Sequence, residues 1–521
     1  MIEKPIILNI DINTVTCPFL KGIMEKGTVS EKDLYPFIDQ YIDAYGTEKT
    51  RLGAIALNTF CQFSSTKSQV MTDIFTYTEK KATAGDNVKD KWYEIFHRIN
   101  KEFGIEPWGV WVKRCRERGV EPWLSIRMND AHDTDYEESL KDEFAFRAKW
   151  NGYAIGDKYG YYWKCLDYAE KEVRDHFLDY IKEQLDIFDV DAVELDFMRE
   201  IYCFKYLENP DCYKIMNGFM RNVKEIVNKS AEKRGHKIKI SARLHRDIAE
   251  NKVFGFDVET WAKEKLVDHI TVTPRWSSSD DAMPIKEWKE KFPSVEIAAG
   301  TEILLRFADM SVKDSSDNSY IATMDPDIVN GLAANYFSQG ADGLYLYNFF
   351  LNPLRHTLLT DITSKVLTTC GEKEKILNSP RRHIIMYQEI YPEGFKPYKP
   401  LPIKLEGNTA AETVTVHTGF IPDNKEAYLI LGFTEGTPSD VEIKVNGAIL
   451  TDFAPTEISL TYENGGTGNL VRLKLDENYT LTDGSKINFY KRKVSLNKDS
   501  GSQDISFGGN NAAIHYIEIT L

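Results

Sequence analysis

Short apolar and β-branched runs alternate with helical stretches between residues 5 and 370, and closely spaced strand and turn signals follow from about residue 400 to the end of the chain. The first pattern is typical of repeated βα units around a parallel sheet, and eight such strands predict a (β/α)8 (TIM) barrel. The second pattern is typical of an all-β sandwich. We therefore predict a barrel domain over residues 1–380 and a C-terminal β-sandwich domain over residues 381–521.

Eight runs are expected to form the barrel strands, because each is short, apolar or β-branched and set between helical segments. These runs are Pro5–Asn13, Leu52–Thr59, Glu121–Met128, Ala192–Phe197, Ile238–Arg243, His269–Thr273, Val295–Ala299 and Gly343–Tyr347. The helical periodicity is clearest over Asp167–Asp189 and over Asp325–Gln339, which Gly340 follows as a C-terminal cap. Long segments follow the second and third strands, on the side of the barrel where active-site loops grow.

The character of the sequence changes near Pro380. Helical periodicity stops, prolines cluster between residues 392 and 402, and alternating runs such as Thr413–His417 and Tyr428–Phe433 follow. Turn signals such as Asn446-Gly447 separate these runs. We expect a domain boundary here, with an accessory sandwich that packs beside the barrel or binds glycan.

Composition excludes some classes of partner. The chain of 521 residues carries 65 Lys and Arg against 80 Asp and Glu, a net charge of −15, which disfavours nucleic acid because phosphate binding needs a basic surface. Apolar residues make up 42% of the chain, enough for a large core, and no run is long enough to span a membrane. The 27 Tyr, 27 Phe and 9 Trp offer flat rings that suit sugar faces or protein interfaces.

Cofactor signals are missing from the sequence. The seven cysteines are scattered without a CxxC pair, so we expect mostly reduced thiols and no zinc framework. The histidines are also scattered, and there is no P-loop, GxGxxG or GxSxG motif, so neither a metal nor a nucleotide cofactor is predicted. The N-terminus enters a strand-like run without a signal peptide. We expect a cytoplasmic protein, or a periplasmic or secreted one if a signal peptide has been removed; the oligomeric state stays open.

The fourth predicted strand carries two acids. Its sequence places Glu194 and Asp196 two residues apart, so their side chains share one face, opposite Val193 and Leu195. In a closed barrel that face points inward, and inward carboxylates need cations, hydrogen bonds or protonation, which are conditions typical of functional sites. We therefore predict Asp196 as a catalytic residue and Glu194 as a further catalytic candidate.

Other predicted strands also end in polar or aromatic residues, which would converge at one face of a barrel. We interpret this set as substrate-binding candidates, while a solvated loop or an ordinary core position is the alternative for each. The set is Arg127, Asn129, Asp130, His132, Arg199, His245, Arg275, Trp276, Tyr347 and Asn348, with Phe349 as a further stacking surface.

Two segments resemble a known family. The helix that starts Leu166-Asp-Tyr-Ala-Glu-Lys and leads into Val190-Asp-Ala-Val-Glu-Leu-Asp-Phe-Met-Arg, together with Ser125-Ile-Arg-Met-Asn-Asp-Ala-His-Asp, is similar to the third and fourth βα units of glycosyl hydrolase-like barrels. These are bacterial barrels related to family 10 glycosidases. The resemblance covers about residues 5–370. It implies a barrel that cleaves glycosidic bonds, with Asp196 at the position of a catalytic carboxylate.

Glycoside hydrolysis needs two carboxyl groups. We prefer Glu302 as the partner of Asp196, because the seventh strand is followed by Gly300-Thr301, where we expect the backbone to turn and bring Glu302 into the cleft within about 10 Å of Asp196. Glu194, Glu200 and Asp130 remain rivals.

Two other functions stay open. A non-catalytic glycan-binding protein would keep the barrel and its aromatic surfaces but lack the acid pair. A sugar-acid lyase or isomerase would use Arg127, Arg243 and Arg275 to hold a substrate carboxylate.

Overall fold

The structure is a computed structural model. It describes residues 3–11, 22–25, 27–43, 50–61, 63–83, 85, 92–131, 153–275, 279–303, 310–349, 357–387, 390–407 and 411–521.

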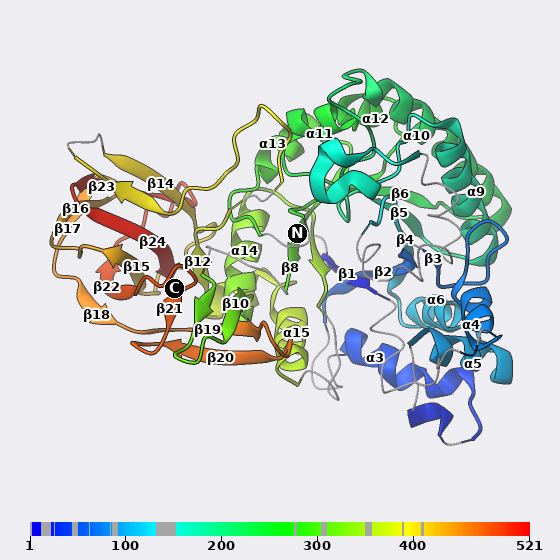
Figure 1. The fold of residues 1–521 in the computed structure, drawn as a ribbon, viewed down its shortest axis with the longest axis horizontal. Coiled ribbons are helices and arrows are strands. Elements are labelled where there is room, and N and C mark those ends of the chain that lie inside the picture. The colour runs from blue at the N-terminus through cyan, green and yellow to red at the C-terminus, as the bar shows by residue number, and fades with distance from the viewer. Residues whose placement is uncertain are drawn as a thin grey trace. The chain divides into compact units, whose positions relative to one another are not determined.

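Eight parallel strands close into a barrel within these described residues (Figure 1). The sheet order is β1-β11-β8-β7-β6-β5-β4-β2, and β1 pairs with β2 to complete the ring. A short strand, β3 (Phe63–Ser64), folds back antiparallel on β2. The barrel strands are β1 (Ile6–Ile10), β2 (Leu52–Cys61), β4 (Glu121–Arg127), β5 (Ala192–Asp196), β6 (Lys239–Leu244), β7 (His269–Val272), β8 (Glu296–Glu302) and β11 (Gly343–Tyr347).

The eight strands lie at the positions that the sequence predicted, so the barrel is confirmed. Several strand ends differ by a few residues, and the end of β8 is the one that affects a predicted site residue. Gly300 and Thr301 do not form a turn, because β8 continues through them and ends at Glu302. All but the first residue of β8 are buried, and the small side chains of that stretch fit a strand packed on both faces as well as they fit a turn.

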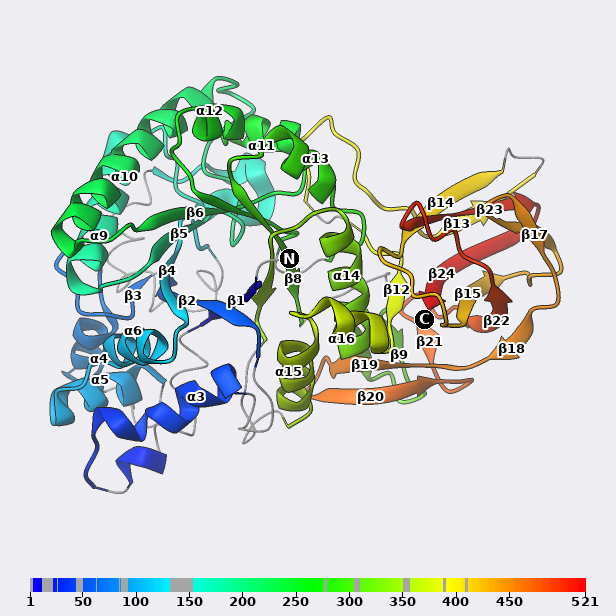
Figure 2. The same ribbon diagram turned by 180° about the vertical axis from the view of Figure 1, so that it is seen from behind.

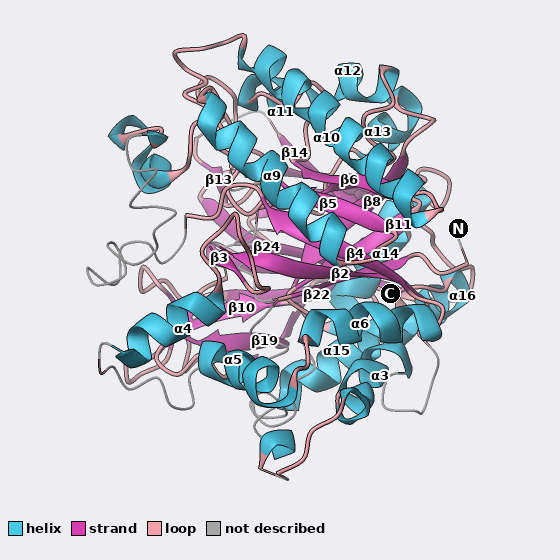
Figure 3. Cartoon of the chain, turned by 90° about the vertical axis from the view of Figure 1, so that its right-hand side faces the viewer, coloured by secondary structure: helices cyan, strands magenta, loops and turns pink. Residues whose placement is uncertain are grey.

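Helices lie outside the strands, as Figure 3 shows. The predicted helix over Asp167–Asp189 is present as α9, whose buried residues Val173, Phe177, Ile181 and Leu185 recur at three- and four-residue spacing. The helices between the barrel strands are η1 (Glu31–Asp33), α3 (Tyr35–Asp43), α4 (Ile74–Thr83), α5 (Trp92–Phe103), α6 (Pro107–Glu117), η4 (Asp157–Lys164), α9 (Lys171–Ile187), α10 (Cys212–Arg234), α11 (Ile248–Phe254), α12 (Val258–Lys263), α13 (Ile285–Lys291) and α14 (Pro326–Ser338), with α15 (Thr357–Thr369) and α16 (Lys373–Asn378) after the last strand.

The C-terminal region is antiparallel, as predicted for a sandwich (Figure 2). A six-stranded sheet has the order β12-β24-β15-β22-β18 with β13 beside β24, and a four-stranded sheet has the order β14-β23-β16-β17. The strands of these two sheets are β12 (Arg382–Ile384), β13 (Ile403–Leu405), β14 (Glu412–His417), β15 (Ala427–Glu435), β16 (Val441–Val445), β17 (Ala448–Leu450), β18 (Ala454–Thr456), β22 (Asn488–Val494), β23 (Ser502–Gly509) and β24 (Ala512–Thr520).

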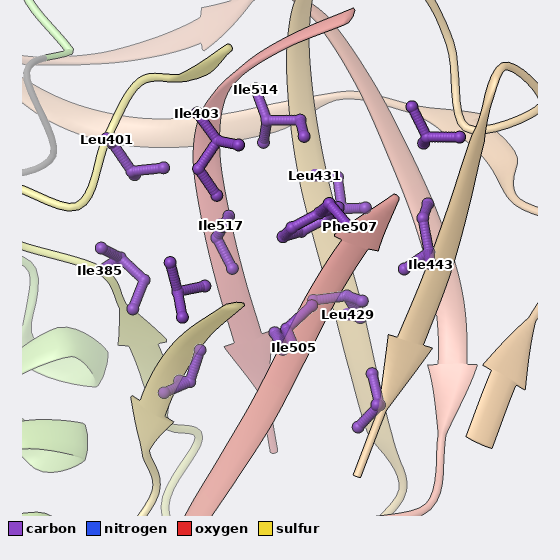
Figure 4. Close-up of a cluster of buried hydrophobic side chains, with 14 of the residues drawn as sticks. Ile385, Leu401, Ile403, Leu429, Leu431, Ile443, Ile505, Phe507, Ile514 and Ile517 are labelled. Atoms are coloured by element: carbon purple, nitrogen blue, oxygen red, sulfur yellow. The ribbon is translucent and has the colours of Figure 1, made fainter. Parts of the chain in front are cut away.

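A continuous apolar core joins these two sheets (Figure 4). Leu429, Leu431 and Ile517 from the larger sheet pack in one cluster with Ile505 and Phe507 from the smaller sheet, and all five side chains are buried. Alternating side chains that fill the space between two sheets define a sandwich. The predicted C-terminal sandwich is therefore confirmed.

A third antiparallel sheet combines strands that are far apart in the sequence. Its order is β20-β19-β10-β9-β21. The hairpin of β9 (Val312–Lys313) and β10 (Ser319–Thr323) belongs to the segment between β8 and α14, whereas β19 (Ile458–Asn464), β20 (Leu470–Leu475) and β21 (Thr480–Leu481) belong to the C-terminal region. The sequence analysis did not foresee this pairing.

The chain divides into two compact units, and we describe each by itself. One unit comprises residues 6–273 and 287–298, and the other comprises residues 299–521 with 274–286 and the N-terminal residues up to Pro5. The boundary at residue 380 stays a prediction.

Candidate functional site

Two layers of buried polar side chains line the strands β4 to β7. Strand pairing sets four residues side by side in the deeper layer, namely Ser125, Glu194, Ser241 and His269. The upper layer lies two residues further along each strand and therefore on the same face. It consists of Arg127, Asp196, Arg243 and Thr271. The upper layer stands at the C-terminal ends of the strands, where barrel enzymes carry their sites.

Two hydrogen bonds show that these layers face the barrel interior. Asn9 on β1 donates from Nδ2 to Oγ of Ser125 at 3.4 Å, and Arg127 donates from Nη2 to Oδ2 of Asp11, just after β1, at 2.6 Å. Strand β2 lies between β1 and β4 in the sheet. Both bonds therefore cross the interior, and Asp196, in register with Arg127, shares that orientation.

Asp196 is held tightly. Its Oδ1 accepts from the backbone amides of Met198 at 2.8 Å and Arg199 at 3.1 Å, and Nη1 of Arg243 donates to Oδ1 at 3.1 Å and to Oδ2 at 3.0 Å. The side chains of Asp196 and Arg243 are each only 1% exposed. One charged donor and two backbone amides thus hold this carboxyl group in one orientation.

A second ion network surrounds this carboxylate. Arg127 donates from Nη1 to Oδ2 of Asp130 at 2.9 Å and from Nη2 to Asp11, while Nε of Arg199 lies 3.7 Å from Oδ1 of Asp130. All of these side chains are at least nine-tenths buried except that of Asp11, which is 11% exposed. Both oxygens of Asp130 therefore face arginines, which leaves Asp130 poorly suited to giving up a proton.

Glu194 lies in the deeper layer. Ser125 donates from Oγ to Oε1 of Glu194 at 2.8 Å, and Glu194 is fully buried. In the same layer Oγ of Ser241 and Nδ1 of His269 lie 2.9 Å apart. Burial and, to a lesser extent, the charge of Lys239 lower the pKa of His269 to about 3. His269 is therefore neutral, and this layer forms a hydrogen-bonded floor beneath Asp196.

Asn129 joins loops. Its Nδ2 donates to the carbonyl oxygens of Leu166 and Tyr202, at 2.9 Å each, and its Oδ1 accepts from the amide of Leu166 at 2.9 Å. The side chain thus ties the end of β4 to segments that precede α9 and follow β5. Its hydrogen bonds hold the main chain, and its predicted contact with substrate stays a prediction.

His245 directly follows β6 and is 1% exposed. Its Nδ1 accepts from the amide of Asp247 at 3.2 Å and lies 3.6 Å from Oε2 of Glu250. Accepting a hydrogen bond at Nδ1 leaves the proton on Nε2 in the neutral imidazole. Asn251 closes the same turn, donating from Nδ2 to the carbonyl oxygen of His245 at 2.8 Å.

Glu302 ends β8, is 2% exposed, and accepts from Nδ2 of Asn348 at its Oε1. Asn348 follows β11 in a left-handed backbone conformation with φ of 63°, which asparagine tolerates better than most residues. Tyr347 is 1% exposed and Arg275 is 6% exposed, so both are buried. The structure thus brings Asn348 to Glu302, two of the predicted site residues.

Two predicted site residues, His132 and Trp276, lie outside the described residues. Glu200, a rival for the second carboxyl, is fully buried. The pairing of Asp196 with Glu302, and the roles of all the candidates, stay predictions.

Sequence reasoning missed two features. One is Asp11, which accepts from Arg127 two strands away in the barrel; a lone acid after the first strand carried no signal. The other is a group of aromatic rings in the segments after β4 and β5, for which the run Tyr159-Gly-Tyr-Tyr-Trp was a usable signal.

A surface cleft of about 580 Å³ also lies between α4, α5 and the segment before α4. It is lined mainly by polar side chains, among them Lys67, Gln69, Glu79 and His97, and it contains no predicted site residue.

Among the described residues, no group of three or more His, Cys, Asp or Glu side chains is arranged to hold a metal ion. Five cysteine side chains in this part of the chain are buried, namely Cys115, Cys165, Cys203, Cys212 and Cys370. No helix within the described ranges is long and apolar enough to cross a membrane.

Comparison with known proteins finds no matching family model and no matching curated relative. Solved structures similar to the chain include glycoside hydrolases. The α-L-fucosidase isoenzyme 2 of Paenibacillus thiaminolyticus is 11% identical with a TM-score of 0.43, covering 73% of this chain and 51% of the fucosidase. A chitinase of Paenibacillus sp. strain FPU-7 is 9% identical with a TM-score of 0.41, covering 95% of this chain and 52% of the chitinase.

An α-amylase of Lactobacillus plantarum is 12% identical with a TM-score of 0.36, covering 94% of this chain and 99% of the amylase. The chain spans about half the length of the fucosidase and of the chitinase. Similarities of this size carry no argument about activity. The specific likeness to family 10 glycosidases stays a prediction.

Proposed function

We propose that this chain is a glycoside hydrolase that cleaves a glycosidic bond in an oligo- or polysaccharide by paired-carboxylate catalysis. The observation that carries the proposal is the placement of Asp196. Its buried carboxylate lies at the C-terminal end of β5, faces the barrel interior, and is held by Arg243 and two backbone amides. A fixed negative charge of this kind stabilises the oxocarbenium-like transition state of glycoside cleavage.

In this proposal Asp196 is the nucleophile or the general base. A general acid needs a proton on one carboxyl oxygen, whereas both oxygens of Asp196 accept hydrogen bonds from Arg243. The second carboxyl, the acid, is proposed to be Glu302, which ends the barrel strand β8 and accepts a hydrogen bond from the neutral amide of Asn348. Asp130 is disfavoured because Arg127 and Arg199 flank it, and Glu194 is disfavoured because it lies in the deeper layer.

The lyase or isomerase alternative requires arginines that hold a substrate carboxylate. Arg127 and Arg243 instead bind carboxylates of the chain itself, Asp11 and Asp130 for the first and Asp196 for the second. Their guanidinium groups already have the partners that such a substrate would need to displace. This observation favours hydrolysis.

The test uses turnover by the full chain. The substrates are 4-nitrophenyl glycosides of glucose, galactose, xylose, mannose, fucose and N-acetylglucosamine, and the neutral hexasaccharides cellohexaose, xylohexaose, mannohexaose and maltohexaose. Asp196→Asn is expected to lower kcat/KM at least about a thousandfold. Asp191→Asn is the matched control, because Asp191 directly precedes the same strand at its N-terminal end, where barrel residues serve stability; it should retain wild-type turnover.

Glu302→Gln separates the roles of the two carboxyls. Loss of the acid slows substrates with poor leaving groups more than substrates with good ones, so hydrolysis of the hexasaccharide should fall further than hydrolysis of the nitrophenyl glycoside. Hexasaccharide binding without any turnover by the wild type would favour the glycan-binding alternative. An unsaturated product would favour the lyase.

A further inference from the structure

Five aromatic rings gather in the segments that follow β4, β5 and β6. The rings of Tyr162 and Tyr202 have centroids 4.4 Å apart, those of Tyr159 and Tyr206 are 5.7 Å apart, and Tyr202 and Tyr206 each lie 5.4 Å from Phe254. We call these five residues the tyrosine cluster. Tyr159 and Tyr162 belong to η4, drawn in cyan in Figure 1, and Phe254 ends α11. Three separate loops thus contribute to one group.

The tyrosine cluster has a buried layer and a partly exposed layer. Tyr159, Tyr206 and Phe254 are buried, whereas Tyr162 and Tyr202 are half-buried. Burial raises the pKa of Tyr159 to about 12, so its phenol stays neutral. Tyr162 and Tyr202 each contact the buried Tyr159 or Phe254 or one another, with their own rings inclined by 37°, and part of each of the two side chains stays accessible.

The cluster is continuous with the candidate site. Tyr202 is three residues beyond Arg199, whose amide donates to Asp196, and its carbonyl oxygen accepts from Asn129 at the end of β4. Phe254 lies with its ring centroid 6.0 Å from that of His245 at the end of β6. These connections place the cluster at the same end of the strands as Asp196.

The charges around the cluster are paired. Nζ of Lys158 lies 3.7 Å from Oε1 of Glu208, and Nζ of Lys205 lies 3.8 Å from Oδ2 of Asp167. No excess of positive charge therefore faces an incoming ligand at these positions. A flat ring surface with phenol groups at its edge suits the apolar face and the hydroxyl groups of an uncharged sugar.

We propose that Tyr162 and Tyr202 form a subsite that stacks against a neutral sugar unit of an oligosaccharide, away from the unit whose bond is cleaved. This inference deepens the proposed function and rests on it for the statement that the bound chain is a substrate. The subsite itself requires only that a neutral oligosaccharide binds. We expect this subsite to favour longer oligosaccharides over shorter ones and uncharged sugars over charged ones.

The test measures binding of cellohexaose, xylohexaose, mannohexaose and maltohexaose to the full chain by isothermal titration calorimetry, with hexagalacturonate as the charged comparison. Tyr202→Ala and Tyr162→Ala are each expected to weaken the Kd of the neutral hexasaccharide that binds by about tenfold, which corresponds to about 1.4 kcal/mol. Tyr202→Phe keeps the ring and should stay within about threefold of wild type. Tyr391→Ala is the matched control, because Tyr391 is an exposed tyrosine outside the cluster, and it should bind as wild type.

Each outcome decides one proposal. Unchanged Kd in both alanine variants, no neutral hexasaccharide binding by the wild type, or tighter binding of hexagalacturonate overturns the subsite. Hexasaccharide binding that depends on Tyr162 and Tyr202 but leads to no hydrolysis supports the subsite and overturns the proposed function. If Tyr202→Ala does not fold by circular dichroism, Tyr162→Ala carries the same test. For substrates that are hydrolysed, KM of the hexasaccharide should rise while KM of the nitrophenyl monoglycoside stays unchanged.

Discussion

Asp196 and Glu302 are both buried carboxylates at the C-terminal ends of barrel strands, yet they are held by different kinds of neighbour. Asp196 is held by the amides of the two residues that start the next loop and by Arg243 on the adjacent strand. Glu302 is held by Asn348, beyond the next barrel strand. Both carboxylates thus bind a residue on or just after an adjacent barrel strand, but Asp196 also binds its own loop and a charged side chain, whereas Asn348 offers Glu302 a neutral amide.

The segment that follows Glu302 also forms hydrogen bonds that connect it to the C-terminal strands. The carbonyl oxygen of Ile303 accepts from the amide of Met324 at 3.2 Å. The next residue, Asp325, accepts at Oδ1 from Oγ1 of Thr461 at 2.5 Å and from Nη1 of Arg472 at 2.7 Å. Thr461 lies on β19 and Arg472 lies on β20. The segment that follows Glu302 is thus anchored in the C-terminal strands.

We infer that the positions of the two carboxylates depend on different parts of the chain. Changes in the C-terminal strands should disturb Glu302 and leave Asp196 in place. The following predictions test this difference, beginning with the largest expected effect.

Asp196→Asn should destabilise the chain, because the amide leaves the buried charge of Arg243 without its carboxylate. Breaking a buried pair in this way costs about 3–5 kcal/mol in the free energy of unfolding, measured by urea denaturation. Adding Arg243→Met to Asp196→Asn removes the uncompensated charge and should recover a large part of that loss. A single variant as stable as wild type would contradict the ion pair.

Asp325→Asn should destabilise by a smaller amount, about 2 kcal/mol, because Asp325 is buried but its partner Arg472 is 51% exposed and so is partly screened by water. Asp317→Asn is the matched control in the preceding hairpin. Asp317 is 79% exposed in its pair with Lys313, so its loss should change stability by less than about 0.5 kcal/mol.

The same Asp325 variant also probes activity. If Glu302 is the acid, Asp325→Asn should lower turnover of the hexasaccharide more than turnover of the nitrophenyl glycoside, reproducing a weaker form of Glu302→Gln. Equal losses on both substrates would show that the C-terminal strands do not act through Glu302.

Replacing glycine by alanine should change the free energy of unfolding in opposite directions at two helix positions. In α14, a Cβ at Gly331 would lie 2.3 Å from the carbonyl oxygen of Arg382, whereas in α10 a Cβ at Gly218 would meet nothing within 4 Å. Gly218→Ala should stabilise by up to about 1 kcal/mol through helix propensity. Gly331→Ala should destabilise by about 1–3 kcal/mol because the backbone of β12 must shift. Thermal denaturation of both variants checks the signs, and stabilisation by Gly331→Ala would refute the close packing of α14 on β12.

Each of the two units contains a buried histidine that should lower the stability of the chain in acid. Burial lowers the pKa of His269 and of His383 to about 3 each. Between the unfolded value near 6.5 and about 3, the unfolded chain binds a proton that the folded chain refuses, so stability falls as pH falls. Each histidine contributes a slope of about 1.4 kcal/mol per pH unit in that window. His269→Gln and His383→Gln should each reduce the loss measured by urea denaturation between pH 6.5 and pH 4.5.

His236 is the control of opposite sign. The hydrogen bond to Asp189 raises the pKa of His236, so its stabilising contribution is present at low pH and is lost as pH rises through the raised value. His236→Gln should therefore not reduce the loss of stability on acidification. A reduction equal to that of His269→Gln would show that burial is not the cause.

Much of the barrel was predictable, because strand patterns and the rule that barrel sites stand at the C-terminal strand ends depend on short stretches of sequence. The shared face of Glu194 and Asp196 follows from the two-residue period of a strand. The end of β8 was predicted wrongly, since Gly300 and Thr301 are as compatible with a buried strand as with a turn. The tyrosine cluster was missed, because its rings come from three loops whose meeting no local pattern records.

Local sequence patterns were enough to predict the eight strands, their order along the chain, the inward position of Asp196 and the change to a sandwich, since each depends on periodicity and turn chemistry. The tertiary structure alone decided what those residues contact. Arg127 meets Asp11 two strands away, Asn129 meets Tyr202, and β10 pairs with β19 more than a hundred residues further along the chain. Such contacts depend on strand register and on loop paths in space, which a one-dimensional pattern does not contain.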